Sequence, residues 1–136
     1  MVSHRGHCRC EGVVILAKCE PEIKVYCHCD DCRRSAGAPI IAAVSFEKSH
    51  IDWQSSDTLA RYENGSCTRL FCNRYGSPIA QEHESAPTRT YFNTAFMDEP
   101  ENFAPEAHSY STEQLSWLKL NDTLPRHEKT VSIQAR

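Results

Sequence analysis

Three cysteines within six consecutive positions restrict this chain more than any other feature of its sequence. Cys27, Cys29 and Cys32 lie in the segment VYCHCDDCRRSAGAP, residues 25–39. Residues i and i+2 of a strand face the same side, so Cys27 and Cys29 are predicted to present their sulfurs together. A tight turn at Asp30 and Asp31 would then bring in Cys32. Three thiolates occupy three corners of a zinc tetrahedron and leave the fourth open, which is typical of catalytic zinc.

A second Cys-x-Cys pair, Cys8 and Cys10 in HCRCEG, needs partners from elsewhere in the chain. Cys72, in LFCNRYGSP, is the expected third ligand. A zinc knuckle would read Cys-x-x-Cys-Gly there, but Tyr75 stands in place of the fourth cysteine. A phenol is a poor zinc ligand at neutral pH beside a thiolate. We therefore expect this site to bind zinc weakly, to use water or a borrowed ligand, or to stand empty, with the Tyr75 ring packed against neighbouring strands.

Two residues are candidates for the borrowed ligand, Cys67 first and His7 second. Cys67 lies five positions before Cys72, and in a regular strand this odd spacing turns it to the opposite face. His4 and His7 lie near the first pair in sequence, but surface positions are the simpler interpretation for both.

Charge and chain length exclude several classes of function. The 136 residues suffice for one domain with its own core. The net charge of −3 gives no overall indication of binding to nucleic acid or to an anionic membrane. The N-terminal sequence shows no signal peptide, and the longest apolar runs, VVILA and IIAAV, are too short to span a bilayer. We expect a cytoplasmic protein whose eight cysteines bind metal or do chemistry, rather than a secreted disulfide-rich domain.

Short segments rich in Val, Ile, Tyr, Phe and Thr, separated by turn residues, predict a mainly β fold. The segment 111–120, STEQLSWLKL, is the one helical pattern, with Ser111 or Thr112 as N-cap. Trp53 and Trp117 are expected in the core. We expect a single domain over residues 1–136, with its core at about 6–125 and a flexible tail at 126–136.

Five segments together resemble the glutathione-dependent formaldehyde-activating enzyme family, which also includes centromere protein V. They are GHCRCEGVV, VYCHCDDCRRSAGAP, RLFCNRYGSP, FMDEPENFAPEAHSY and WLKLNDTLP, in family order from about Gly6 to Pro125. The resemblance implies a β-tent-like fold of several small antiparallel sheets, with one structural and one catalytic zinc. By the same resemblance, Cys27, Cys29 and Cys32 match the catalytic ligands. Cys8, Cys10 and Cys72 match three of the four structural ligands, and Tyr75 stands at the fourth.

The resemblance also implies an activity, the addition of glutathione to formaldehyde, which is a carbon–sulfur lyase reaction when written in reverse. Three thiolates on Zn²⁺ leave a net charge of −1, which suits holding a substrate thiol as thiolate better than making hydroxide from water. The expected partners are a small-molecule thiol, with glutathione as possible cosubstrate, and a small electrophile. A larger electrophile, a zinc scaffold without catalysis and an interaction module like centromere protein V are the alternatives.

For several other residues near the cysteines or in the later motif, the sequence leaves more than one role open. Arg33 and Arg34 follow the last ligand and are candidates to offset the site's charge or to clamp a carboxylate of glutathione, with a surface pair as the alternative. His28 and Asp30 are expected on a solvated face, away from the metal. Asp98 and His108 lie in the later motif, FMDEPENFAPEAHSY, and both are candidates to orient the substrate. Capping of a turn is the alternative role for Asp98.

Overall fold

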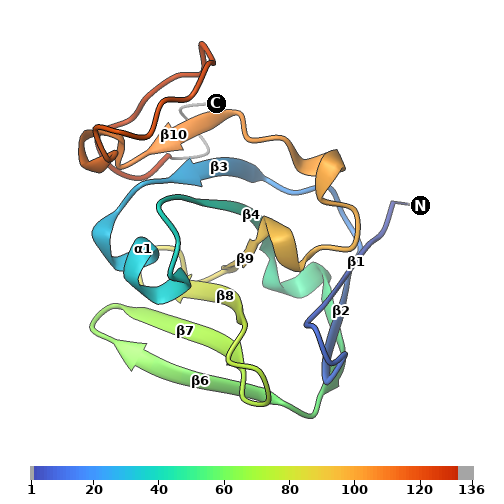
Figure 1. The fold of residues 1–136 in the computed structure, drawn as a ribbon. Helices are drawn as coiled ribbons and strands as arrows, with labels where there is room; N and C mark the ends of the chain where they lie inside the picture. The colour runs from blue at the N-terminus through green and yellow to red at the C-terminus, as the bar shows by residue number, and fades with distance from the viewer. Residues whose placement is uncertain (1, 132–136) are drawn as a thin grey trace.

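Two β-sheets form the fold of this chain, in a computed structural model that describes residues 2–131 (Figure 1). The smaller sheet has the strand order β1-β2-β5 and the larger sheet has the order β10-β3-β4-β9-β8-β7-β6. The strands are β1 His4–His7, β2 Val13–Ala17, β3 Ile23–Cys27, β4 Ile41–Glu47, β5 Ile51–Ser56, β6 Leu59–Asn64, β7 Cys67–Cys72, β8 Pro78–His83, β9 Arg89–Asn93 and β10 Ala107–Ser109. Neighbouring strands pair antiparallel, except that β10 runs parallel to β3.

The main core lies where the small sheet packs on the large one. In β2, VVILA, buried and half-buried side chains alternate, so Val13, Ile15 and Ala17 face inward. They meet apolar side chains of the large sheet, among them Phe46 of β4 and Phe92 of β9. Burying one such large side chain stabilises the fold by roughly 1.5–3 kcal/mol.

The mainly β prediction is confirmed, but the helix was expected in the wrong place. The α-helix is α1, Asp30–Ala36, at the cysteine turn. Cys29 is its N-cap and accepts a hydrogen bond from the Cys32 backbone N–H, and Gly37 ends it with a left-handed conformation, φ 66°. Asp30 and Asp31 therefore begin a helix instead of making only a tight turn.

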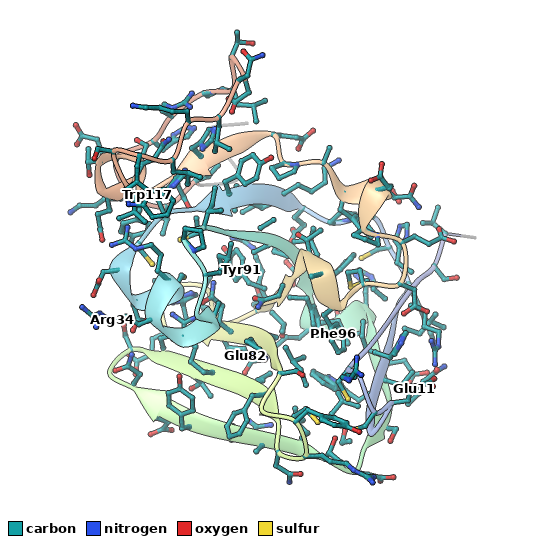
Figure 2. The ribbon with its side chains drawn as sticks, viewed as in Figure 1. Glu11, Arg34, Glu82, Tyr91, Phe96 and Trp117 are labelled. Carbon is teal, nitrogen blue, oxygen red and sulfur yellow. The ribbon has the colours of Figure 1, made fainter. Side chains whose placement is uncertain are left out.

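The segment 111–120 forms one 3₁₀ turn, Ser111–Glu113, and then continues without a helix. Trp117 is 67% exposed on the outside of this segment, so its prediction as a core residue is wrong (Figure 2). With Trp117 in solvent, the segment buries too little apolar surface on one side to hold a helix there. Trp53 is half-buried against the core, and its ring lies 5.8 Å from that of Phe92.

Three further 3₁₀ turns connect the strands, at Lys48–His50, Thr94–Phe96 and Pro100–Phe103. The chain then returns through β10 and pairs with its own later segment. The backbone N–H of His127 donates to the carbonyl of His108, and Val131 is buried beside β3. Residues 126–131 of the expected tail thus lie against the sheet, and residues 132–136 fall outside the described part of the chain.

Candidate metal centres

The first cysteine cluster sits where β3 gives way to α1. Cys27 is the last residue of β3, Cys29 is the N-cap of α1 and Cys32 lies in its first turn. Their three sulfurs lie within 4.8 Å of one another, with Cys27 and Cys32 3.5 Å apart. The expected convergence is present, but a strand end and a helix start produce it, rather than one face of a strand.

The spacing of these sulfurs fits a metal better than a disulfide. Bonded sulfurs stand about 2.05 Å apart. Two thiolates on one tetrahedral zinc, each about 2.3 Å from the metal, stand about 3.8 Å apart. The Cys32 backbone N–H also donates to Cys29 Sγ at 3.2 Å, a contact that stabilises a thiolate. The donor set therefore fits Zn²⁺ with three protein ligands.

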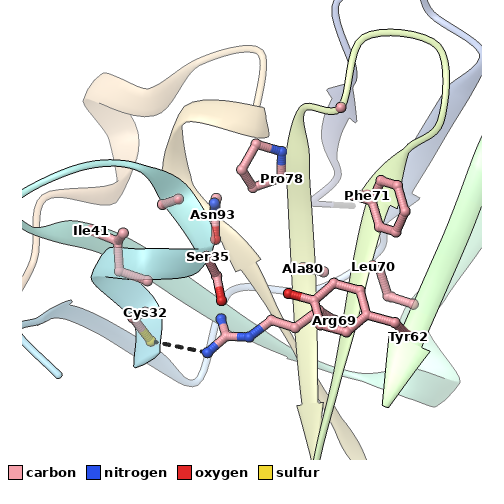
Figure 3. A pocket seen from close by; sticks show the side chains of 12 residues that line it. Cys32, Ser35, Ile41, Tyr62, Arg69, Leu70, Phe71, Pro78, Ala80 and Asn93 are labelled. Atoms are coloured by element: carbon pink, nitrogen blue, oxygen red, sulfur yellow. Dashed lines mark hydrogen bonds between the residues drawn. The ribbon is translucent and has the colours of Figure 1, made fainter. Parts of the chain in front are cut away.

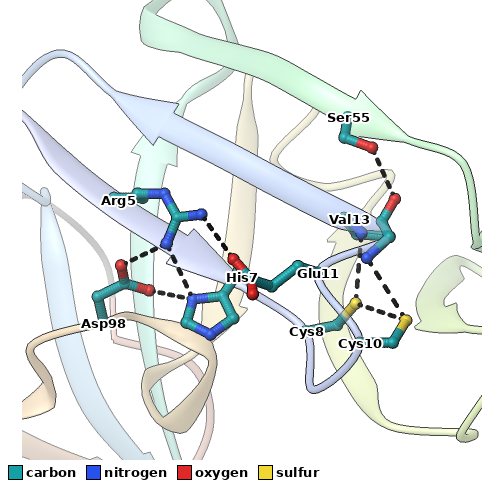
Figure 4. Close-up of polar contacts among 9 residues, drawn as sticks. Arg5, His7, Cys8, Cys10, Glu11, Val13, Ser55 and Asp98 are labelled. Carbon is teal, nitrogen blue, oxygen red and sulfur yellow. Dashed lines mark hydrogen bonds and ion pairs between the residues drawn. The ribbon is translucent and has the colours of Figure 1, made fainter.

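The second cluster brings together cysteines that are far apart in sequence. Cys8 and Cys10 lie in the turn between β1 and β2, rather than side by side on a strand, and Cys72 ends β7. Cys8 Sγ and Cys10 Sγ are 3.7 Å apart, and Cys10 Sγ and Cys72 Sγ are 3.6 Å apart. Backbone N–H groups of Gly12 and Val13 donate to Cys10 and Cys8 (Figure 4). This donor set also fits zinc by its spacing.

The residues considered for the fourth place in the second cluster lie elsewhere. Tyr75 is 56% exposed, with the Arg9 guanidinium 5.8 Å from its ring centroid, so its prediction as a packing residue is wrong. Cys67 starts β7, and among the described residues it joins neither metal-binding group. His7 Nδ1 lies 2.5 Å from Asp98, and His4 lies 2.7 Å from Glu20.

The two arginines after the first cluster have unequal positions. Arg33 Nη1 donates to the His28 carbonyl at 2.8 Å and to the Glu113 carbonyl at 2.5 Å. It therefore ties the cysteine turn to the C-terminal segment. The Arg34 side chain is 80% exposed, points outward in Figure 2 and pairs with Asp30 of the same helix.

A third arginine, which the sequence reasoning missed, lies against the first cluster. Arg69 is 8% exposed in β7, and its Nη2 donates to Cys32 Sγ at 3.6 Å. It also donates to Gln81 Oε1 at 2.5 Å and to Asp31. Burial opposes the charge, but the hydrogen bonds to Asp31 and Cys32 raise the pKa of Arg69 above its ordinary value. A single charged residue in the strand-forming run CTRLFC was the available signal.

Cys32 and Arg69 both line a pocket of about 220 Å³ (Figure 3). Most of its remaining wall is apolar and comes from Ile41, Tyr62, Leu70, Phe71, Pro78 and Ala80. A wider hollow of about 730 Å³ shares Ile41, Pro78 and Asn93 with this pocket and reaches His7, Cys8 and Asp98. The two hollows are therefore neighbours, one beside Cys32 of the first cluster and the other beside Cys8 of the second.

Thiols in the two clusters have different acidities. A hydrogen bond with Cys27, together with burial, raises the pKa of the Cys32 thiol to about 11. Burial also opposes ionisation of Cys72, but hydrogen bonds with the Thr58 hydroxyl and with the backbone of Tyr75 and Arg74 lower the pKa of Cys72 to about 6. Without metal, the Cys32 thiol is therefore harder to ionise than the Cys72 thiol.

His28 lies between two ligands of the first cluster and is fully buried, so its expected solvated position is wrong. Its Nε2 lies 2.8 Å from His108 Nδ1, and His108 Nε2 lies 3.1 Å from both carboxylate oxygens of Asp122. Burial, and then the nearby His108, lower the pKa of His28 to about 4. Asp30, as expected, is exposed.

The two residues left open in the later motif lie in different places. His108 belongs to the buried histidine pair, whereas Asp98 accepts a hydrogen bond from Arg5 and pairs with His7 (Figure 4). Asp98 and His7 both line the wider hollow. Asp122, the carboxylate beside His108, lies in the segment WLKLNDTLP, but the sequence alone did not pair it with His108.

Comparison with known proteins identifies the family. The model of the family described as glutathione-dependent formaldehyde-activating enzyme matches residues 3–113. The chain belongs to this family. The match spans both cysteine clusters and Arg69, so the pocket of Figure 3 lies inside the family domain.

Among the solved structures that match, one has a TM-score of 0.55 and 20% identity, over 90% of this chain and 98% of the other. It is the crystal structure of a Rhodobacter sphaeroides protein from structural genomics, and at this identity the likeness shows the fold alone. No curated protein matched the chain. Within residues 2–131, no helix is long and apolar enough to cross a membrane.

Proposed function

We propose that this protein is a zinc-dependent carbon–sulfur lyase that joins a small thiol to a small electrophile. We further propose that the chain forms a single domain and that it acts in the cytoplasm. The family name supports the reaction class, and the two cysteine clusters support zinc as the metal. Glutathione is the proposed thiol, and formaldehyde or a larger carbonyl compound is the proposed electrophile.

The observation that carries this proposal is a three-sulfur cluster with one member, Cys32, in the wall of a pocket. Cys27, Cys29 and Cys32 supply three ligands, and Cys32 lines the pocket. When bound there, zinc would lower the pKa of a substrate thiol and hold it as the thiolate. The pocket beside Cys32 gives that thiol a place to enter.

The chemical step forms one carbon–sulfur bond and is redox-neutral. The substrate sulfur adds to the carbonyl carbon, the C=O π pair moves to oxygen, and the proton lost by the thiol ends on that oxygen. Arg69 lines the same pocket, and its guanidinium can stabilise the negative charge that develops on the carbonyl oxygen. The apolar wall of Ile41, Leu70 and Phe71 limits the access of water to the reacting atoms.

Arg33 and Arg34 take different parts in the proposal. Arg33 holds the turn that carries the ligands through its two backbone contacts. Arg34 has an exposed guanidinium and remains the candidate for a carboxylate of glutathione.

The test combines metal analysis with turnover. We expect purified protein to contain zinc and to consume glutathione in the presence of formaldehyde or a bulkier aldehyde. Changing Cys29 to serine should remove zinc from the first cluster and abolish turnover. Cys19→Ser is the matched control, because Cys19 belongs to neither metal-binding group among the described residues. Full turnover by the Cys29 variant would refute the proposal, and zinc binding without thiol consumption would favour a scaffold.

A further inference from the structure

Thr58 lies where a fourth ligand of the second cluster would stand. Its hydroxyl oxygen, Oγ1, is 3.3 Å from Cys72 Sγ, 3.8 Å from Cys10 Sγ and 4.0 Å from Cys8 Sγ. These distances resemble the 3.6 and 3.7 Å that separate the sulfurs themselves. Five of the six distances among this oxygen and the three sulfurs thus lie between 3.3 and 4.0 Å, and the sixth, from Cys8 Sγ to Cys72 Sγ, is within 4.8 Å.

Four atoms at such distances are the corners of a tetrahedron. The centre of a regular tetrahedron with edges of this length lies about 2.3 Å from each corner, which is the usual zinc–sulfur distance. Zinc–oxygen bonds are slightly shorter, about 2.0–2.2 Å, so a shift of a few tenths of an ångström would bring Oγ1 to bonding distance. A hydroxyl oxygen has two lone pairs, and one of them can face the metal.

The backbone holds Thr58 at this corner from both cysteine-bearing segments. The Thr58 N–H donates to the Gly12 carbonyl at 3.3 Å, and the Asn73 N–H donates to the Thr58 carbonyl at 2.8 Å. Gly12 leaves the space that the side chain needs, because a Cβ there would lie 2.4 Å from Thr58 Oγ1. The turn that carries Thr58 is therefore held beside both Cys10 and Cys72.

We propose that Thr58 Oγ1 is the fourth ligand of the second metal site, which closes it as a three-cysteine, one-threonine zinc site. Thr58 then supplies the fourth ligand in place of the cysteine that was expected at position 75, where this chain has Tyr75. This inference does not depend on the proposed enzymatic activity. A closed second site contrasts with the open first one, and its neutral oxygen should hold zinc less tightly than a fourth thiolate would.

The test uses cobalt absorption in a chain whose first cluster is disabled by Cys27→Ser and Cys29→Ser. Thr58→Cys should raise the sulfur-to-cobalt charge-transfer absorbance by about one third, because four thiolates replace three. Thr58→Val keeps the shape of the side chain but removes its oxygen, so the fourth coordination position of the metal opens. Added 2-mercaptoethanol should then bind the cobalt and change its absorption spectrum. The parent spectrum should not respond to 2-mercaptoethanol, and Thr58→Ser should behave as the parent does.

A second measurement uses the otherwise unchanged chain, so that the result does not depend on the disabled background. Thr58→Val should release zinc from the second site to a chromogenic chelator at least about tenfold faster than the parent. Adding Tyr75→Cys to Thr58→Val should restore retention. Ser55→Ala is the control, because Ser55 donates to the Gly12 carbonyl at 2.9 Å but contacts no sulfur (Figure 4).

Two results would overturn the assignment. One is a Thr58→Cys spectrum identical to that of the parent, which would show that position 58 does not reach the metal. The other is a parent site that binds 2-mercaptoethanol as readily as Thr58→Val does, which would show that the fourth corner is open.

Discussion

Arg69 is the side chain whose charge bears most directly on the first cysteine cluster. With Zn²⁺ bound, the three thiolates would give the cluster a net charge of −1, and a buried cation beside one of the sulfurs would offset it. Arg69 donates to Cys32 Sγ and is held by Asp31 and Gln81, so its guanidinium has little freedom to move away. The same group borders the space where substrate would bind.

We expect Arg69→Met to lower kcat/KM for thiol addition by about 10²–10³, because a preorganised charge is lost from the reacting site. Arg69→Lys should recover part of this loss, since it keeps the charge but not the forked geometry. Steady-state kinetics with zinc analysis on the same samples measures both effects. Arg61→Met is the control, because Arg61 lies at an exposed position of β6. Arg69→Met protein with full zinc and turnover within about twofold of the parent would contradict this role.

At the scale of elements, α1 decides the geometry of the first cluster. Cys29 caps the helix, Cys32 lies in its first turn and Arg33 fastens it to the Glu113 carbonyl. A helix of seven residues is too short to be stable alone, so contacts outside the helix hold it. The Arg33 tether is one of them, and we expect a metal bound by Cys29 and Cys32 to be another.

Removing zinc should therefore loosen α1 while most of the sheets remain folded. Hydrogen exchange should rise in a peptide over residues 28–38 after chelation, because ligation of Cys29 and Cys32 no longer fixes the first turn. The peptide over β9, Arg89–Asn93, should change little, since that strand is in the interior of the large sheet. Equal protection of α1 with and without zinc would show that packing alone maintains the helix.

The sequence predicted the fold class and the cysteine groups, but not the helix or two of the side chains beside the sulfurs. Spacing predicted the group of Cys27, Cys29 and Cys32, whereas the segment LFCNRYGSP and the family resemblance added Cys72 to the second group. The β-rich composition predicted the fold class. The helix at 30–36 was missed because Asp30 and Asp31 are equally common in turns and in first helical turns, and a cysteine N-cap is unusual. Arg69 and Thr58 were missed because strand pairing and a turn, not sequence proximity, bring them to the sulfurs.

At the scale of the whole molecule, the second cluster joins the two sheets. Cys8 and Cys10 lie in the turn between strands of the small sheet, whereas Cys72 ends a strand of the large sheet. Thr58 lies on the connection from β5 to β6, where the chain passes from one sheet to the other. The first cluster, in contrast, joins positions that are already close along the chain.

This difference predicts that losing the second site costs more stability than losing the first. Cys10 and Cys72 are 62 positions apart, whereas Cys27 and Cys32 are 5 apart. A cross-link that closes the longer loop removes more entropy from the unfolded chain, and the difference amounts to roughly 2 kcal/mol. Cys72→Ser and Cys32→Ser make the same chemical change at buried positions, so they form a matched pair. In zinc-loaded protein, calorimetry should show a Tm about 6 °C lower for Cys72→Ser than for Cys32→Ser. Equal Tm values would mean that packing between the sheets, rather than metal, sets the stability of the whole domain.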